Sequence, residues 1–181
     1  MKIGIISDTH DDLESVDQSI IVFNNENLDI VIHAGDYIFP GVVERFMKLK
    51  KAKLVGVLGN NDGEKIGLYE KFSKIGGDLR GDYCEINIDG LVFGVYHGTS
   101  KHMTEAAIAS GQYDVFVHGH THIKRAEKID GTLVLNPGTA HRTFPNVNGE
   151  TESSPHVIIF DTDLKSYRFV PIFNDYSIIR T

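Results

Sequence analysis

Two patterns of hydrophobic residues alternate in the first half of the chain: short continuous apolar runs, and apolar residues spaced at the helical period. Short runs rich in β-branched residues predict three buried strands: Lys2 to Ser7, Ile30 to Ile32 and Leu54 to Leu58. Between them, apolar residues recur near the helical period and predict two helices: Leu13, Val16, Ile20 and Phe23, then Val42, Val43, Phe46 and Leu49. Asp11, followed by Glu14, supplies a start signal for the first helix. This half is therefore predicted to be βαβαβ.

The second half is predicted to be mostly β-structure. Polar and apolar residues alternate from Tyr83 to Ile88, and the Asp89-Gly90 pair suits a hairpin turn. One helix is expected from Lys101 to Ser110. The further strands are Val92 to Tyr96, Asp114 to Val117, Ile123 to Ile129, Thr132 to Leu135, His156 to Phe160 and Tyr167 to Pro171. The stretch from Asn136 to Pro155 lacks periodicity and is rich in turn formers, which predicts a long loop of the kind that often carries function.

This order of elements predicts an α/β fold in a single domain spanning residues 1–181. Later strands that form hairpins favour two stacked mixed β-sheets with helices outside, rather than one wholly parallel sheet. The chain has 181 residues, of which 41% are hydrophobic and 24% charged, as is ordinary for a soluble globular protein.

Charge and cysteine content narrow the class of partner and the compartment. The formal net charge of −7 argues against binding to long nucleic acids, although one cationic pocket can still take a small anion. Cys84 is the only cysteine, which excludes a disulfide framework and a cysteine-based zinc site and fits a reducing compartment. The opening MKIGIISD resembles no signal peptide, and no apolar span has transmembrane length. We expect a cytoplasmic protein with no membrane partner.

Candidate chemistry is concentrated where strands end. The run VFVHGHTH places histidines at 118, 120 and 122, but a His-x-His pair is a weak metal motif without acidic partners. The loops after the first three strands supply such partners, and in an alternating β and α order these loops converge on one edge of the sheet. Together with the histidine that ends FGVYH, the set is Asp8, His10, Asp36, Asn60, His97, His120 and His122.

These side chains are too many for one ion. Mixed nitrogen and oxygen ligands without thiolate suit manganese, iron, zinc, nickel or cobalt rather than calcium or magnesium. Two divalent ions, two carboxylates and a bridging hydroxide leave a charge of roughly +1, which attracts a phosphate anion to an otherwise acidic protein. We therefore expect two divalent transition-metal ions, with manganese preferred, and a small phosphate-ester substrate.

The ordered motifs DTH, GD, GNND, YHG and GHTH resemble those of the calcineurin-like metallophosphoesterase superfamily, particularly its small single-domain bacterial and archaeal phosphodiesterases. The resemblance covers Lys2 to about Pro171. It implies a four-layer αββα sandwich and a hydrolase in which a hydroxide bridging two metals attacks phosphorus in line with the leaving oxygen. It also implies that Asp8, His10 and His122 hold the first ion, that Asn60, His97 and His120 hold the second, and that Asp36 bridges both. His118 and His33 are then not ligands, and each is either a strand-end side chain or a residue that holds a ligand in place.

The sequence departs from that superfamily at Asn61, where a histidine is usual. An amide cannot act as a general acid at neutral pH, so good leaving groups or another donor, such as His141 or a metal-bound water, are expected. Asp62 is either a residue that orients a ligand or a turn residue before Gly63. We take Asn61 and Asp62 as the catalytic candidates. The substrate-binding candidates are Thr139, His141 and Arg142 of the long loop, with Arg142 either a phosphate clamp or simply solvated.

Several functions are compatible with this resemblance. A phosphodiesterase is predicted first, with a phosphomonoesterase and a non-catalytic binding scaffold like the retromer subunit as alternatives. A scaffold need not retain all of the metal-binding side chains, whereas this chain does. A serine hydrolase is excluded by the lack of G-x-S-x-G, and the acidic balance disfavours a nuclease acting on long polymers. Homo-oligomer formation is left open.

Overall fold

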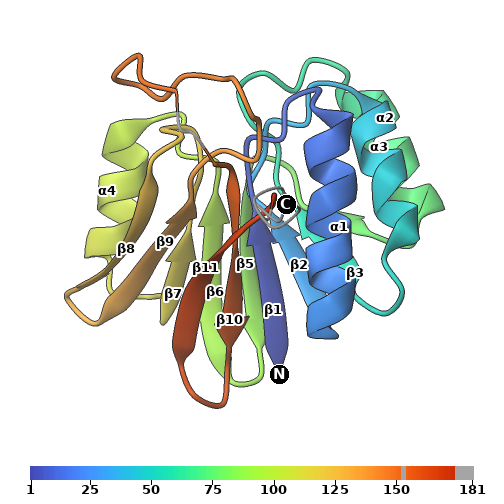
Figure 1. Cartoon of the computed structure of the whole chain (residues 1–181). Coiled ribbons are helices and arrows are strands. Elements are labelled where there is room, and N and C mark those ends of the chain that lie inside the picture. The colour runs from blue at the N-terminus through green and yellow to red at the C-terminus, as the bar shows by residue number, and fades with distance from the viewer. Residues whose placement is uncertain (152–153, 174–181) are drawn as a thin grey trace, which may run out of the picture.

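The computed structural model describes residues 1–151 and 154–173 (Figure 1). Its helices are α1 (Leu13–Glu26), α2 (Pro40–Arg45), α3 (Lys65–Lys74) and α4 (Lys101–Ala109), with a short 3-10 helix η1 (Phe46–Lys48) after α2. Its strands are β1 (Lys2–Ile6), β2 (Ile30–His33), β3 (Lys53–Gly56), β4 (Asp78–Leu79), β5 (Tyr83–Ile88), β6 (Leu91–Tyr96), β7 (Val115–Val117), β8 (Lys124–Ile129), β9 (Thr132–Pro137), β10 (His156–Asp161) and β11 (Ser166–Pro171).

The strands form two mixed sheets. The first has the order β11-β10-β1-β2-β3-β4, in which β1 to β4 are parallel and β10 runs antiparallel to β1. The second has the order β5-β6-β7-β9-β8, in which β6, β7 and β9 are parallel and the outer strands are antiparallel to their neighbours. The parallel strands of each sheet deliver their following loops to one edge, as βα connections require.

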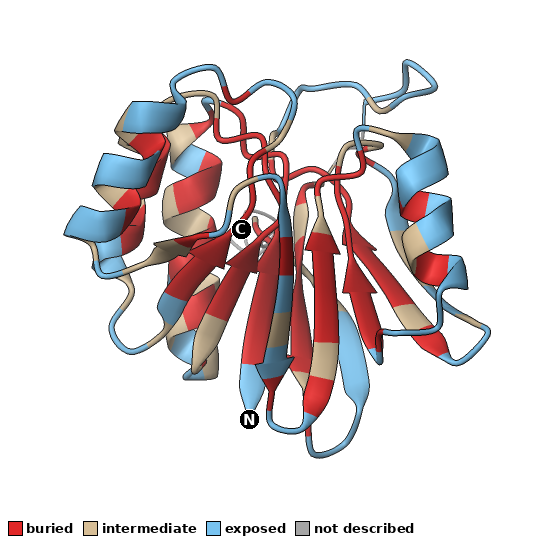
Figure 2. Ribbon diagram, turned by 180° about the vertical axis from the view of Figure 1, so that it is seen from behind, coloured by how far each residue is buried: buried red, intermediate tan, exposed pale blue. Residues whose placement is uncertain are grey.

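Three apolar layers hold the sheets and helices together. Phe23 of α1, Phe72 of α3 and Val31 pack between the helices and the first sheet. The next residue of β2, Ile32, points the other way and packs between the two sheets, because side chains alternate along a strand. Ile108 of α4 belongs to a third cluster on the outer face of the second sheet. Figure 2 shows the central strands buried along most of their length, the edge strands β5, β8 and β11 largely exposed or half-buried, and the helices with exposed outer faces. The predicted α/β fold with two stacked sheets and four layers is confirmed.

Local signals explain the helix bounds. Asp12 caps α1 by accepting a hydrogen bond from the backbone N–H of Ser15 at 3.1 Å, so the start signal lies one residue after Asp11. Pro40 stands in the first turn of α2, where its missing N–H does no harm. The second predicted helix is broken at Phe46 into α2 and η1. Among the described residues, none of the helices combines the length and apolar character needed to span a membrane.

Two elements were absent from the sequence prediction. Helix α3 buries only Leu68 and Phe72, and its other positions are polar or solvated, so its hydrophobic signal is short. Strand β4 has two residues, too few to show a period. The predicted long loop begins later than expected, because Asn136 and Pro137 still belong to β9. Residues 152–153 of that loop and 174–181 of the predicted domain lie outside the described residues.

Candidate metal centre

The loops after β1 and β2 lie side by side. The backbone N–H of Asp8 donates to the carbonyl of Gly35 at 3.0 Å, and that of His10 donates to the carbonyl of Asp36 at 3.0 Å. These bonds continue the parallel pairing of the two strands beyond the sheet. They bring the two predicted carboxylates, Asp8 and Asp36, to the same point on the sheet edge.

A first group of possible ligands consists of Asp8, His10 and His122, all buried. Nε2 of His122 lies 3.1 Å from Oδ1 of Asp8 and 3.3 Å from Nε2 of His10. Two imidazole nitrogens that face each other at this distance cannot both carry a proton. One carboxylate oxygen and two ring nitrogens that converge from separate loops match the donor set of a transition-metal ion.

A second group shares Asp8 with the first and adds Asp36 and His97. Nε2 of His97 lies 3.3 Å from Oδ2 of Asp36 and 3.8 Å from Oδ1 of Asp8. That nitrogen is buried and makes no hydrogen bond within the described part of the chain. A buried unsatisfied ring nitrogen beside two carboxylates is unfavourable by itself, and a bound cation removes the penalty. The residues therefore fit a metal ion. The carboxylate common to the two groups is Asp8, whereas the family resemblance implies Asp36 as the bridge, and that assignment remains a prediction.

The histidine tautomers support the same conclusion. Nδ1 of His97 donates to the carbonyl of Ala34 at 2.7 Å, and Nδ1 of His122 donates to the carbonyl of Pro145 at 2.7 Å. In each neutral ring the proton is thereby fixed on Nδ1, so Nε2 presents a lone pair to the carboxylates. Outer hydrogen bonds of this kind orient metal-ligating histidines.

The backbone at the site is held in an unusual conformation. Five of the predicted ligands have φ values in the left-handed region, which residues other than glycine seldom adopt: Asp8 (53°), His10 (45°), Asp36 (62°), His120 (67°) and His122 (57°). Close approach also requires glycine nearby, since a Cβ on Gly119 would lie 2.4 Å from Oδ2 of Asp8 and one on Gly59 would lie 2.1 Å from Oδ1 of Asp36. These backbone features turn the ligand side chains toward a common centre.

Burial and the carboxylates oppose each other in setting the charges. Burial disfavours protonation of His97, but Asp36 and Asp8 outweigh it and raise the pKa of that imidazole to about 9. Burial also opposes ionisation of Asp36, but the nearby His97 and Asn61 hold the pKa of the carboxyl below its ordinary value. Burial lowers the pKa of His10. Without an ion, the carboxylates are therefore ionised and His97 is protonated at neutral pH, so a cation that binds here displaces the proton of His97.

His120 and Asn60 lie next to these two groups. The backbone N–H of His120 donates to both oxygens of Asp8, at 3.0 and 3.2 Å, and its ring makes an edge contact with His97 at a centroid distance of 5.3 Å. Oδ1 of Asn60 accepts a hydrogen bond from Thr99 at 3.3 Å. Their assignment to the second ion remains a prediction.

Asn61 and Asp62 lie behind Asp36. The amide side chain of Asn61 donates to Oδ2 of Asp36 at 2.7 Å, and its backbone N–H donates to Oδ1 at 2.9 Å. The buried carboxylate of Asp62 accepts four backbone N–H bonds, from Asp36, Tyr37, Ile38 and Gly59, at 2.7 to 2.9 Å. In this arrangement Asn61 fixes the position of Asp36, a predicted metal ligand, and Asp62 joins the loops after β2 and β3.

The three substrate-binding candidates hold the long loop against the loop between β1 and α1. Oγ1 of Thr139 donates to the carbonyl of Asp8 at 2.9 Å, and Nε2 of His141 lies 3.7 Å from Asp11. The guanidinium of Arg142 is engaged by both oxygens of Asp12, at 2.8 and 3.0 Å, and by Glu14. Because Arg142 is already paired with two carboxylates, a role as phosphate clamp requires it to leave Asp12.

Sequence reasoning missed Phe144, which supports one of the histidines, and it left open whether His33 is a strand-end side chain or holds a ligand in place. Phe144 stacks on His10 with a centroid distance of 4.1 Å and an interplanar angle of 7°. His33 accepts the N–H of Gly35 on Nδ1 at 3.2 Å and contacts Thr9 Oγ1 through Nε2 at 3.0 Å. Burial lowers the pKa of His33 to about 3, so it is neutral. No periodicity or motif marks Phe144, because its contact depends on how an irregular loop returns to the site.

Comparisons with known proteins agree with this geometry. The sequence matches the calcineurin-like phosphoesterase superfamily domain over residues 1–165. It is 40% identical over 169 residues to a phosphodiesterase of Methanocaldococcus jannaschii, covering 93% of this chain and 97% of the relative. It is similar to the structure of an archaeal phosphodiesterase, with a TM-score of 0.84 and 40% identity, covering 94% of this chain and 99% of that one. Zinc-bound Vps29 from Entamoeba histolytica shares the fold alone, with a TM-score of 0.65 and 15% identity over 96% of this chain and 100% of that one.

Proposed function

The chain belongs to the calcineurin-like phosphoesterase superfamily, and from this premise we propose that it is a metal-dependent phosphodiesterase acting on small phosphodiesters. The observation that carries the proposal is the pair of ligand groups that share Asp8. A shared carboxylate between two groups is the arrangement that two adjacent ions need. We further propose that manganese is the preferred metal and that the chain acts in the cytoplasm, where its unpaired Cys84 stays reduced.

The residues of the chain prepare the site in three ways. When bound, two divalent ions would supply a nucleophile at neutral pH and neutralise charge on the phosphoryl oxygens. Asp8 and Asp36 hold the negative charge that retains the ions, and Asn61 fixes both oxygens of Asp36 in place. The Nδ1 bonds of His97 and His122 keep their Nε2 lone pairs aimed at the centre. Such preorganisation lowers the barrier because no group must reorient during the reaction.

Asn61 bears on the choice of substrate. Its amide is committed to Asp36 and has no acidic proton for a leaving alkoxide. General acid catalysis is typically worth about a hundredfold to ten-thousandfold, so its absence weighs most on poor leaving groups. We therefore propose that diesters with stabilised leaving groups, such as aryl esters, are hydrolysed faster than dialkyl esters.

A turnover experiment tests the proposal. Protein stripped with a chelator and reloaded with Mn²⁺ is assayed on bis(4-nitrophenyl) phosphate and on 4-nitrophenyl phosphate, with elemental analysis of bound metal. We expect diester turnover, about two ions per chain, and loss of activity on stripping or in Asp36→Ala. Asp82→Ala is the control, because the side chain of Asp82 is 76% exposed and pairs with Lys65 rather than with a residue of the site. Full activity in the metal-free protein overturns the proposal, and a preference for the monoester favours the phosphomonoesterase alternative.

The scaffold alternative makes a different prediction. A binding scaffold of this fold has no turnover under any metal condition and depends on a protein partner instead. Crosslinking of the purified, Mn²⁺-loaded chain to a stable partner, together with absent diester turnover, is the result that favours it. The retained ligand groups favour the enzyme, because a scaffold has no need of buried carboxylates held beside ring nitrogens.

A further inference from the structure

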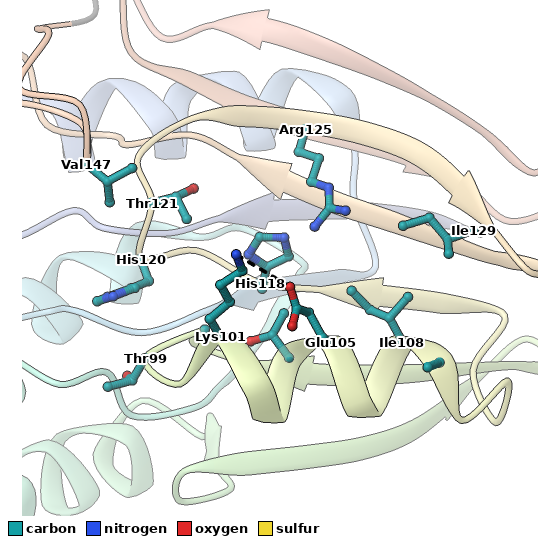
Figure 3. A pocket seen from close by; sticks show the side chains of 13 residues that line it. Thr99, Lys101, Glu105, Ile108, His118, His120, Thr121, Arg125, Ile129 and Val147 are labelled. Atoms are coloured by element: carbon teal, nitrogen blue, oxygen red, sulfur yellow. Dashed lines mark ion pairs between the residues drawn. The ribbon is translucent and has the colours of Figure 1, made fainter.

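A large pocket opens between α4 and β8, beside the metal centre (Figure 3). It has a volume of about 600 Å³, which lies within the range of small-molecule sites. Its wall is largely apolar, with Ile108 and Ala109 from α4, Ile129 from β8 and Val147 from the long loop. The pocket does not contain the carboxylates of the metal centre, but it borders them.

The pocket and the metal centre share residues. His120 lines the pocket, while its backbone N–H donates to Asp8 and its ring contacts His97. Gly98, which directly follows His97, also lines the pocket. A phosphate held at the metal centre would therefore lie beside the end of the pocket that Gly98 and His120 line.

The charges in the pocket wall are already compensated. Lys101 pairs with Glu105 at 3.7 Å, and Arg125 pairs with Glu127 on the same strand. Because each cation has a carboxylate beside it, the wall carries no net positive charge and suits an uncharged group better than a second anion. Its apolar wall suits a flat aromatic group, which buries much area with little loss of conformational freedom.

His118 lies in the pocket wall, and one of its ring nitrogens is buried without a hydrogen-bond partner within the part of the chain that the structure describes. Its imidazole lies in the pocket wall between the α4 side chains and Arg125 (Figure 3), is 4% exposed, and leaves Nε2 without a hydrogen-bond partner in the described residues. The side-chain amide of Asn136 has nearer acceptors, the carbonyl of Gly119 at 2.9 Å and Oγ1 of Thr121 at 3.1 Å. Nδ1 of His118 is then the donor to the Gly119 carbonyl at 3.1 Å, which leaves Nε2 as an acceptor. Because Nε2 itself is covered by its neighbours, the imidazole adds little polarity to the surface that faces the pocket.

We propose that this pocket, defined by Ile108, Ala109, Ile129 and Val147 with His118 in its wall, binds an aromatic ester substituent of the phosphodiester substrate. The inference rests on the proposed function and names its substrate class: diesters in which one substituent is a flat, uncharged ring system. It makes Ala109 and its neighbours specificity-determining residues, which touch the substituent and not the reacting phosphorus.

Phosphonates test the pocket by binding alone. Phenylphosphonate and methylphosphonate present the same charged head and differ in the group that reaches the pocket. Their affinities for the Mn²⁺-loaded protein are measured by calorimetry, with inorganic phosphate as reference and the metal-free protein as blank. Because burial of a phenyl ring removes much apolar area from water, we expect phenylphosphonate to bind about tenfold more tightly than methylphosphonate.

A matched pair of variants locates the effect. Ala109→Trp fills the pocket from the end of α4, whereas Ala106→Trp adds the same side chain at an exposed position of the same helix that does not line the pocket. We expect the tenfold gap to persist in Ala106→Trp and to fall below about threefold in Ala109→Trp, with methylphosphonate affinity unchanged in both. Equal melting temperatures of the two variants show that neither has lost its fold.

Each contrary result has a distinct meaning. Equal affinity of the two phosphonates in the unmodified protein overturns the pocket assignment and leaves the proposed phosphodiesterase standing. A gap that survives in Ala109→Trp places the ring on another surface and also overturns the assignment. If neither phosphonate nor phosphate binds in the presence of Mn²⁺, the proposed function itself fails.

Discussion

At the scale of single residues, side chains behind the predicted metal ligands hold those ligands in position. Asp62 uses both carboxylate oxygens to collect four backbone N–H groups from two loops. Burial raises the pKa of its carboxyl, and the backbone N–H donors oppose that rise. A neutral amide at this position would point an N–H₂ group at backbone donors. The charge of Asp62 is therefore part of the structure of the site, although it lies behind it.

Replacement of Asp62 by asparagine should separate this role from catalysis. We expect Asp62→Asn to lower the free energy of unfolding by about 2 to 4 kcal/mol, because buried N–H groups lose a charged acceptor. Displacement of Asp36 should also weaken Mn²⁺ binding by about tenfold to a hundredfold. Urea unfolding of the metal-free protein and calorimetric titration measure the two effects. Asp82→Asn, at a side chain that is 76% exposed, should change stability by less than about 0.5 kcal/mol.

The sequence shows that an asparagine stands at position 61, but it does not show which residue the side chain of Asn61 contacts. The missing histidine is visible in GNND, and so is the conclusion that an amide is no acid. That the amide instead bonds Asp36 depends on the distance between two loops 25 residues apart, which no local pattern encodes. If the bond to Asp36 matters, Asn61→Ala should weaken Mn²⁺ binding by about tenfold in a calorimetric titration. Unchanged affinity in Asn61→Ala would mean that the bond does not support the ion.

At the scale of elements, the sequence predicted those helices and strands whose buried face contains several apolar residues. Helix α1 and the strands around it were found because each buries several residues at one period. Helix α3 was missed because two buried residues, Leu68 and Phe72, carry too little periodicity to distinguish it from a loop. The long loop was expected to carry function, but its path over His10 and His122 depends on tertiary contacts of Phe144 and Pro145.

The loop contact at His10 has a measurable consequence. In Phe144→Ala, the His10 ring loses its stacking partner at 4.1 Å and gains freedom, so we expect Mn²⁺ to bind about tenfold more weakly and to leave faster in a chelator. Phe144→Tyr keeps the ring and should behave as the unmodified protein. Equal chelation rates for the alanine and tyrosine variants would show that the stack does not support the ligand.

Asp12 joins α1 to the long loop and makes that junction sensitive to acid. Burial opposes its ionisation, but Arg142 and Ser15 outweigh it and lower the pKa of the carboxyl from 3.8 to about 2. Because this pKa is lower in the folded than in the unfolded protein, ionised Asp12 stabilises the fold at pH values above the ordinary pKa of about 4. That stabilisation is lost as pH falls from about 4 toward 2. In urea titrations, the stability gap between the unmodified protein and Asp12→Asn should therefore narrow between pH 5 and pH 3. A gap that stays constant over this interval would contradict an ionised Asp12 as its source.

At the scale of the whole molecule, the metal centre lies on the seam between the two sheets. Asp8, His10 and Asp36 follow strands of the first sheet, whereas His97, His120 and His122 follow strands of the second. The convergence was predictable, because alternating β and α elements direct their loops to one sheet edge. The pocket beside α4 was not, because its wall joins a helix, a strand and a loop whose separation is set only by packing. A cation bound at the seam connects both sheets and should stabilise the molecule as a whole.

As pH rises, the stability contributed by protonated His97 should fall and the stability contributed by a bound metal ion should grow. In the metal-free protein, the pKa of His97 is raised from 6.5 to about 9, so this histidine stabilises the fold below pH 6.5 and loses that contribution as pH rises to 9. Binding of Mn²⁺ requires that proton to leave, so the stability gained from the ion grows with pH over the same range. At a free concentration a hundred times the dissociation constant, one ion adds about 2.7 kcal/mol. Thermal unfolding at pH 6 and pH 8, with and without Mn²⁺, should show a larger metal-induced shift at pH 8, and almost none in Asp36→Ala. An equal shift at both values would mean that the ion does not displace a proton, and an intact shift in Asp36→Ala would place the stabilising ion away from the seam.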